Sequence, residues 1–133
     1  EQENKTVGRY SIDPIVKFFN SRLNVAAHRD NPHDVNVTGC YCKQIFDEQN
    51  GLCAISGEKL TFVKSGAINK RTYTNASIDR IDNSKGYVKN NIQIVSVRMN
   101  MWKSDLSLTK FKNLVKMINN QLNNGDCYES AQG

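Results

Sequence analysis

The sequence predicts an α+β fold, with a small hairpin-plus-helix unit surrounded by helices. Apolar residues recur at helical spacing near both ends of the chain. Between those segments, the turn-forming residues 83–86 separate two short apolar runs, and the second run stops at Ser96, where a short helix can begin. A chain of 133 residues forms one domain with a modest core, so residues 1–133 are expected to be a single domain.

Residues 1–37 are expected to form an N-terminal helical extension. Ser11 offers a helix start, with Asp13 and Pro14 in the first turn. The Asn-Pro step within segment 28–34 breaks the helical pattern and predicts a loop. The apolar residues that follow at helical spacing are Ile15, Phe18, Phe19 and Leu23.

A second helix is expected after Thr38, whose side chain can cap it, and it should end at Asn50 and Gly51. Segment 52–62 has apolar pieces separated by Ser-Gly and predicts an extended, turn-rich path, whereas segment 63–75 predicts a polar loop. The residues expected on one side of the second helix are Cys42, Ile45 and Phe46.

The core motif is expected at about 76–105. Residues 76–81 and 91–95 are the predicted strands of a hairpin, and residues 97–103 fit a short helix. A final helix is expected from about Ser107, closed by an Asn-Asn-Gly stop signal. Its apolar stripe comprises Leu108, Phe111, Leu114, Val115, Ile118 and Leu122.

The composition argues against a membrane protein. The chain is 38% apolar and 23% charged, and no apolar run approaches the ~20 residues of a membrane span. The first ten residues lack the basic-then-apolar layout of a signal peptide, and a leader removed before Glu1 stays open. A cytoplasmic protein with no membrane partner is therefore expected; a bacterial or phage-infected cell is implied only by the family resemblance given below.

The four cysteines favour reduced thiols. Cys40 and Cys42 are followed by the isolated Cys53 and by Cys127 far downstream. This spacing suits neither a dense disulfide framework nor the two paired knuckles of a structural zinc site. Buried thiols are the favoured interpretation, and a zinc-stapled interaction domain is the alternative, which rests on the cysteines alone.

Basic residues are concentrated in one third of the chain. Segment 59–103 holds nine lysines and arginines against two acidic residues, whereas the whole chain has a net charge of +5. An excess confined to one segment is typical of a surface that meets a polyanion, of which nucleic acid is the commonest. The alternative is a solvated basic face.

Two oxygen-bearing side chains are expected to meet in the core motif. Asp79 lies on the first predicted strand and Asn100 on the short helix after the second, so a strand-turn-strand-helix fold can bring their oxygens together. Two oxygen ligands suit one hard divalent cation, Mg²⁺ or Mn²⁺, which keeps several waters and accepts phosphate oxygens. The alternatives are an ion pair of Asp79 with Arg80 or Arg98, and a helix-surface amide at Asn100.

The strings "ASIDRID", "KGYVKNNIQIV" and "RMNMWKSD" resemble the HNH nucleases of the ββα-metal (His-Me finger) superfamily, in the form found in phages and mobile elements. The upstream "FDEQNGLCAISGEKLTF" is similar to the stretch that commonly precedes this motif. The resemblance covers about Thr38 to Leu114, and its ordered series is more specific than any single piece. It implies a divalent-metal-dependent endonuclease that hydrolyses phosphodiester bonds in DNA, expected to be double-stranded.

The resemblance also implies roles for single residues. The family's Asp-His pair, which supplies a metal ligand and the general base, matches Asp79 and Arg80. The central Asn of the family, which braces the loop between the strands, matches Asn91. The last His or Asn, a metal ligand, matches Asn100, and the basic residue that usually follows, which can touch phosphate, matches Lys103. The other expected contacts with nucleic acid are Arg80, Lys85, Lys89 and Arg98.

Arg80 departs from the family pattern, because an arginine stays protonated and cannot accept a proton from water. We expect it to clamp a phosphate, with a salt bridge as the alternative. Three explanations of the missing base stay open: Asp82, Tyr87 or one of His28 and His33 accepts the proton; the cation alone suffices; or hydrolysis is slow or absent. The last would leave a DNA-binding module with an HNH fold.

Two further roles are expected within the core motif. For Asp82 the alternative to accepting a proton is a structural role in the hairpin turn, because an Asp that precedes Asn-Ser can hydrogen-bond the turn backbone. Trp102, with Met99 and Met101, is expected to pack in the core beneath the short helix, the alternative being a base-stacking surface.

Overall fold

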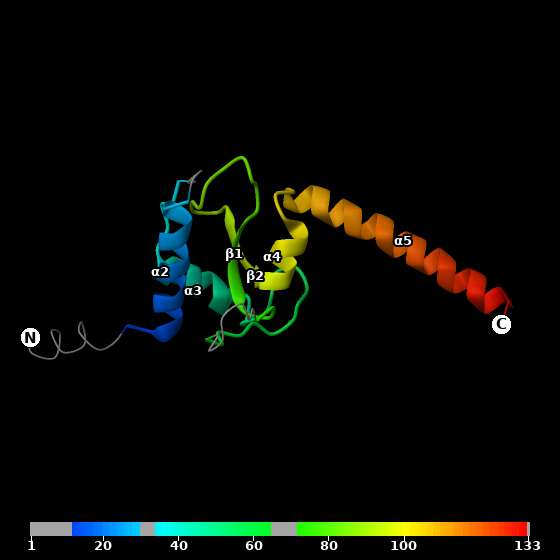
Figure 1. The fold of residues 1–133 in the computed structure, drawn as a ribbon, viewed down its shortest axis with the longest axis horizontal. Helices are drawn as coiled ribbons and strands as arrows, with labels where there is room; N and C mark the ends of the chain where they lie inside the picture. Colours follow the sequence, from blue (N-terminus) through cyan, green and yellow to red (C-terminus); the bar gives the residue numbers. More distant parts are fainter. Residues whose placement is uncertain (1–11, 30–33, 65–71, 133) are drawn as a thin grey trace, which may run out of the picture.

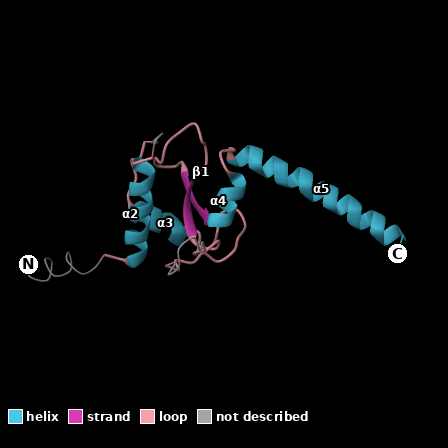
Figure 2. Ribbon diagram, viewed as in Figure 1, coloured by secondary structure: helices cyan, strands magenta, loops and turns pink. Residues whose placement is uncertain are grey.

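The fold is α+β, as the sequence predicts, and its centre is a two-stranded hairpin followed by a short helix (Figures 1 and 2). The computed structural model describes residues 12–29, 34–64 and 72–132. In chain order the elements are α2 (Pro14–Ala27), α3 (Gly39–Glu48), β1 (Ala76–Arg80), β2 (Ile92–Ser96), α4 (Val97–Lys103) and α5 (Leu108–Gln132). In Figure 1, α2 and α3 lie on one side of the hairpin and α4 on the other, while α5 projects away from the body.

Helix α2 begins at Pro14, two residues later than a cap at Ser11 would place it. Asp13 is the N-cap, and its carboxylate accepts the N–H of Ile15 at 2.7 Å. Proline fits the first helical position because its missing N–H would have no partner there and its φ is already helical. The predicted cap was therefore wrong, and Ser11 itself lies outside the described residues.

Helix α3 has the boundaries that the sequence predicts. Thr38 is the N-cap and its hydroxyl accepts the N–H of Tyr41 at 3.1 Å. After the helix, Asn50 and Gly51 both take positive φ angles, 57° and 74°, which asparagine and glycine tolerate best. Both signals are local, so the sequence alone was enough to find them.

A close contact at Gly39 fixes how α2 and α3 cross. A Cβ added there would lie 2.5 Å from the carbonyl oxygen of Val16 and 2.5 Å from Oδ1 of Asn20, so glycine is required. The same Oδ1 accepts the N–H of Gly39 at 2.8 Å. This packing holds α2 against α3, which itself packs on β2, and so determines the residues that α2 can present to the site described below.

The hairpin pairs β1 and β2 in antiparallel register, with Ile78 opposite Ile94 and Asp79 opposite Gln93. Strand β1 ends one residue before its predicted limit, and β2 both begins and ends one residue later than predicted. All five residues of β2 are buried, because α3 and α4 cover it from different sides. The apolar core lies between the hairpin and the first two helices. Its most enclosed apolar side chains are Phe19, Cys42, Ile94 and Val95.

Helix α4 begins as predicted at the cap residue Ser96, whose hydroxyl accepts the N–H of Met99 at 3.2 Å. The prediction that Trp102 and Met101 pack in the core was wrong, since they are 54% and 51% exposed. Trp102 instead contacts Phe111 edge to face, with ring centroids 5.6 Å apart. The indole therefore covers the start of α5 rather than the central core.

Helix α5 continues through Gly125 to Gln132, so the predicted stop at Asn-Asn-Gly was wrong. A single glycine costs a helix only about 1 kcal/mol relative to alanine, and no proline follows to end it. The predicted apolar stripe is present, but Phe111 is its one fully buried member among the described side chains. No helix in the described segments has an apolar stretch long enough to cross a membrane.

Glu58 links the segment before the hairpin to the start of α4. Its carboxylate accepts hydrogen bonds from Arg98, from Ser96 Oγ at 2.6 Å and from Ser56 Oγ at 3.0 Å. The hydrogen bonds from Arg98 and Ser96, with a smaller contribution from Ser56, lower the pKa of Glu58 to about 2. Arg98 is thus an ion-pair partner on this side of the molecule.

We expect Glu58→Gln to flatten the acid side of the stability profile. Because the pKa of Glu58 is lowered by folding, its contribution is present above the pKa of the unfolded chain and disappears as the pH falls towards 2. Urea unfolding of the wild type from pH 6 to pH 2.5 should therefore show a steeper loss than the variant. Glu48→Gln, at an exposed position of α3, is the control; equal slopes for wild type and Glu58→Gln would contradict the assignment.

Candidate functional site

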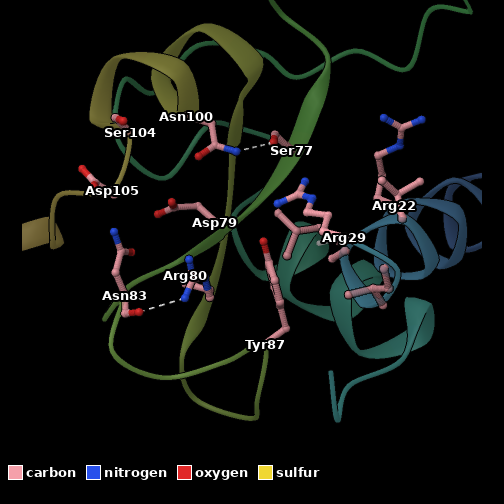
Figure 3. Close-up of a pocket in the computed structure, with 14 residues that line it drawn as sticks. Arg22, Arg29, Ser77, Asp79, Arg80, Asn83, Tyr87, Asn100, Ser104 and Asp105 are labelled. Atoms are coloured by element: carbon pink, nitrogen blue, oxygen red, sulfur yellow. Dashed lines mark hydrogen bonds between the residues drawn. The ribbon is translucent and has the colours of Figure 1, made fainter. Parts of the chain in front are cut away.

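A cavity of about 360 Å³ opens between α2, β1 and the turn after α4. Segments that are far apart in the sequence meet there, because α2 packs on the hairpin and α4 folds back over it (Figure 3). One wall carries acidic and amide groups and the opposite wall carries arginines. The polar residues that line the cavity are Arg22, Arg29, Ser77, Asp79, Arg80, Asn83, Tyr87, Asn100, Ser104 and Asp105.

Asp79 and Asn100 both line this cavity, although they come from β1 and α4. The amide nitrogen of Asn100 donates to Ser77 Oγ at 2.6 Å, which fixes the orientation of the side chain. Among the described residues no hydrogen bond reaches its Oδ1, and Figure 3 shows this oxygen on the side of the Asp79 carboxylate. The structure therefore brings together the two oxygen donors that the sequence singled out.

The Asp79 carboxylate is 4% exposed and each of its oxygens accepts a hydrogen bond. Gln93 Nε2 donates to Oδ2 at 2.8 Å, and Lys103 Nζ donates to Oδ1 at 3.1 Å. Burial raises the pKa of Asp79, and the hydrogen bonds from Gln93 and Lys103 oppose that rise. A lysine ammonium thus serves as the near counter-ion of this carboxylate.

Lys103 does not lie where the predicted phosphate contact requires it. Its side chain is completely buried, and its ammonium also bonds the carbonyl oxygen of Arg80 at 3.0 Å. A third, longer contact of 3.5 Å reaches Asn83 Oδ1. These three partners use all the donors of the ammonium, so Lys103 is an internal cation that ties α4 to β1.

Arg80 lies at the cavity wall but is also engaged with the hairpin loop. Its Nη1 donates to the carbonyl oxygens of Asn83 at 2.8 Å and Lys85 at 3.0 Å. The guanidinium carbon lies 5.5 Å from the centre of the Tyr87 ring, a cation–π distance. These contacts brace the turn.

Asn91 braces the loop between the strands with both ends of its amide. Its Oδ1 accepts the N–H of Asp82 at 2.9 Å, and its Nδ2 donates to the carbonyl oxygens of Asp82 and Gly86 at 3.1 and 2.9 Å. The side chain is 5% exposed, so these bonds lie in a protected environment. Asn91 lies behind the cavity rather than at its wall.

Asp82 has the turn role that was its alternative reading. Its Oδ1 accepts hydrogen bonds from the N–H and the hydroxyl of Ser84, at 2.9 and 2.7 Å. The Ser84 hydrogen bonds lower the pKa of Asp82, which makes it a weaker base. It does not line the cavity formed by the described residues, so the geometry does not place it as the proton acceptor.

Several predicted contacts lie elsewhere on the described surface. Lys85 and Lys89 are exposed on the hairpin loop, outside the cavity wall. Arg98 is paired with Glu58 beside a separate shallow hollow. His28 is exposed at the end of α2, with Nδ1 2.8 Å from the carbonyl oxygen of Asn24, and His33 lies outside the described residues.

Sequence reasoning missed six polar residues of the cavity. Ser77 and Asn83 belong to β1 and the hairpin turn, Arg22 to α2, Arg29 to the residues just after α2, and Ser104 and Asp105 to the turn after α4. Ser104 has a positive φ of 54°, an uncommon backbone conformation for a residue with a side chain. The "RMNMWKSD" string ends on this turn and was a signal for Asp105, whereas the two arginines depend on how α2 packs.

The oxygen donors of Asp79 and Asn100 are chemically suited to a hard divalent cation. One carboxylate and one amide oxygen are suitable for an ion that keeps most of its waters, and no group of three or more His, Cys, Asp or Glu side chains is arranged for a softer metal among the described residues. Cys42 is one buried thiol, and burial raises its pKa to about 12, which favours the protonated form. The Lys103 ammonium on Asp79 would oppose cation binding by repulsion.

Comparison with known proteins gives one informative relative. The chain is 31% identical, over 83 residues, to an uncharacterized 29.0 kDa protein from the dda-modA intergenic region of Enterobacteria phage T4. The match covers 62% of this chain and 30% of the phage protein, so it spans less than a third of that relative. No family model matches the chain, and no solved structure matches it.

Proposed function

We propose that the protein is a divalent-metal-dependent endonuclease of the HNH type that hydrolyses phosphodiester bonds in double-stranded DNA. The observation that carries this proposal is the meeting of Asp79 and Asn100 at one cavity wall, with arginines across from them. The order of strand, loop, strand and short helix agrees with the HNH resemblance of the sequence. The likeness to a phage protein agrees with a phage context for the gene.

In this proposal Asp79 and Asn100 hold one Mg²⁺ or Mn²⁺, which when bound supplies charge stabilisation to the scissile phosphate and the leaving oxygen. Ser77 orients the amide of Asn100, and Gln93 orients the carboxylate of Asp79. The hydrogen bond and positive charge of Lys103 favour the ionised form of that carboxylate against the effect of burial on its pKa. Asn91 and Arg80 act indirectly, by holding the loop that carries the cavity wall.

Two side chains in the cavity are able to take the proton from water. Tyr87 was one of the acceptors considered from the sequence, and Figure 3 shows its hydroxyl directed into the cavity. Asp105 adds an exposed carboxylate on the turn after α4. The proposal therefore assigns the general base to Asp105 or Tyr87 rather than to Asp82. Asp105 is favoured because carboxylates are ordinarily ionised at neutral pH and can accept a proton, whereas a phenol still carries its own.

Supercoiled plasmid incubated with the protein should be converted to nicked or linear DNA in Mg²⁺ or Mn²⁺ and stay intact in EDTA. Asn100→Ala is the matched variant, because it removes one proposed ligand without removing a buried charge. The rates should be followed on agarose gels with both proteins at equal concentration.

Cleavage that continues in EDTA, or that Asn100→Ala leaves unchanged, would contradict the proposed chemistry. The second candidate function is a DNA-binding module that has lost catalysis, and two observations favour it. Arg80 occupies the position of the usual base, and the Lys103 ammonium already neutralises Asp79. Binding of duplex DNA without any cleavage in either metal would identify that function.

A further inference from the structure

We infer that Arg29 and Arg22 form a phosphate-binding wall, which holds a backbone phosphate of DNA across the cavity from Asp79 and Asn100. This inference rests on the proposed function and deepens it, because it names which cations meet the substrate. None of the sequence patterns pointed to α2 as a nucleic-acid contact.

The two arginines come from α2 and from the residues just after it. Arg22 lies in the helix, Arg29 follows the C-cap residue His28, and Figure 3 shows both on the side of the cavity across from Asp79 and Asn100. Leu23 and Ala26, which lie between them, are buried against the core and line the floor of the cavity. Helix α2 and the residues just after it thus place two guanidiniums at the cavity, while the apolar face of the helix anchors this segment to the core.

Both guanidiniums are available to a ligand. Arg22 and Arg29 are exposed, and neither forms an ion pair with a carboxylate of the described residues. Arg22 lies over the Phe18 ring, with its guanidinium carbon 5.5 Å from the ring centre, which limits its freedom without using its hydrogen-bond donors. Figure 3 shows Arg29 extending from the end of α2 toward the strand side of the cavity.

The cations predicted from the sequence are poorer candidates for this contact. Lys103 is buried on Asp79, and Arg98 is paired with Glu58 outside the cavity. Arg80 donates to two carbonyl oxygens of the hairpin loop. The basic charge that faces open solvent at the cavity is therefore supplied largely by Arg22 of α2 and by Arg29 just after it.

The two walls together fit a phosphate with a bound cation. A guanidinium presents paired N–H donors that match two phosphate oxygens, whereas carboxylate and amide oxygens are acceptors and offer a phosphate no hydrogen bond. A phosphate seated between the walls would meet arginine donors on one side and the cation of Asp79 and Asn100 on the other. DNA is the polyanion that fits this arrangement, because its phosphates continue along the exposed basic loop that carries Lys85 and Lys89.

Binding of a short duplex DNA, measured by fluorescence anisotropy in EDTA over a range of salt, tests this wall without cleavage. Arg29→Gln and Arg22→Gln should each weaken binding by about tenfold or more, since each removes hydrogen bonds to a charged group. Each should also reduce the log–log salt slope by about 0.9, the value for one phosphate contact on duplex DNA. Arg29→Lys keeps the positive charge but loses the paired N–H donors of the guanidinium. The salt slope should therefore be unchanged, while binding should still be weaker than in the wild type.

Lys17→Gln is the matched control, because Lys17 is an exposed cation of the same helix that does not line the cavity. Thermal melting should be unchanged for all four variants, as the substituted side chains are exposed. If the arginine variants bind DNA no worse than Lys17→Gln while the wild type still cleaves plasmid, the inference is overturned and the proposed function stands. If binding depends on the arginines but the wild type cleaves no DNA, the phosphate-binding wall is supported and the proposed nuclease activity is contradicted. If the wild type does not bind duplex DNA, both the wall and the nuclease activity are contradicted.

Discussion

Lys103→Met should destabilise the protein by about 3–5 kcal/mol, because it leaves the Asp79 carboxylate buried without a counter-ion. The methionine fills a similar volume, so the loss comes from charge and hydrogen bonding rather than from a cavity. Arg80 O and Asn83 Oδ1 would also lose a donor. Since small domains are stable by about 5–15 kcal/mol, the midpoint of urea unfolding should fall markedly at neutral pH.

Two comparisons separate the ion pair from general damage. Lys112→Met, at an exposed position of α5, should leave the midpoint almost unchanged. Asp79→Asn combined with Lys103→Met removes both charges and should recover a large part of the loss, giving a favourable coupling in a double-mutant cycle. If Lys103→Met destabilised the protein no more than Lys112→Met does, the assignment of Lys103 as an internal counter-ion would be wrong.

The local features of the fold could be predicted because their signals lie within a few residues. Thr38 and Ser96 cap their helices, and Asn50 with Gly51 takes the positive φ angles that end α3. The wrong cap at the start of α2 had the same origin, since Ser11 and Asp13 are both good capping residues and a local rule does not choose between them.

The tertiary features could not be predicted in the same way. Whether Lys103 faces solvent or Asp79 depends on how α4 folds back over the hairpin, and a lysine near a basic motif is usually exposed. The exposure of Trp102 follows from the direction in which α5 leaves the body. The contribution of Arg29 depends on the crossing of α2 and α3 at Gly39, which no spacing within α2 encodes.

The same distinction between local and tertiary signals applies to the residues of the candidate site. Asp79 and Asn100 were predicted to meet because the strand-turn-strand-helix order constrains them over a short stretch of chain, and the structure places them at one cavity. The sequence allows Asp82 two local roles, proton acceptor or turn residue, and the hydrogen bonds that it accepts from Ser84 support the turn role. Arg22 and Arg29 of the opposite wall come from α2 and the residues just after it, far upstream in the sequence, so their role required the three-dimensional packing.

Asn100→Ala should weaken binding of Mn²⁺ and Mg²⁺ by about tenfold or more. Loss of a residue that merely orients a metal ligand typically costs 10–100-fold in affinity, so loss of a direct ligand should cost at least as much. Asn100→Asp should have the opposite effect, because a second carboxylate raises the negative charge around the cation and offsets the repulsion from Lys103. Isothermal titration with MnCl₂ measures all three proteins under the same conditions.

Ser77→Ala distinguishes a metal ligand from a structural amide at Asn100. It removes the partner of Nδ2 and leaves Oδ1 in place, so it should weaken the cation less than Asn100→Ala does while disturbing the same hydrogen bond. If Asn100 acts only through that hydrogen bond, the two alanine variants will have equal affinities and Asn100→Asp will bring no gain. The amide oxygen would then be a surface group of α4, and the cavity would keep one carboxylate, already neutralised by Lys103, with nothing to complete a cation site.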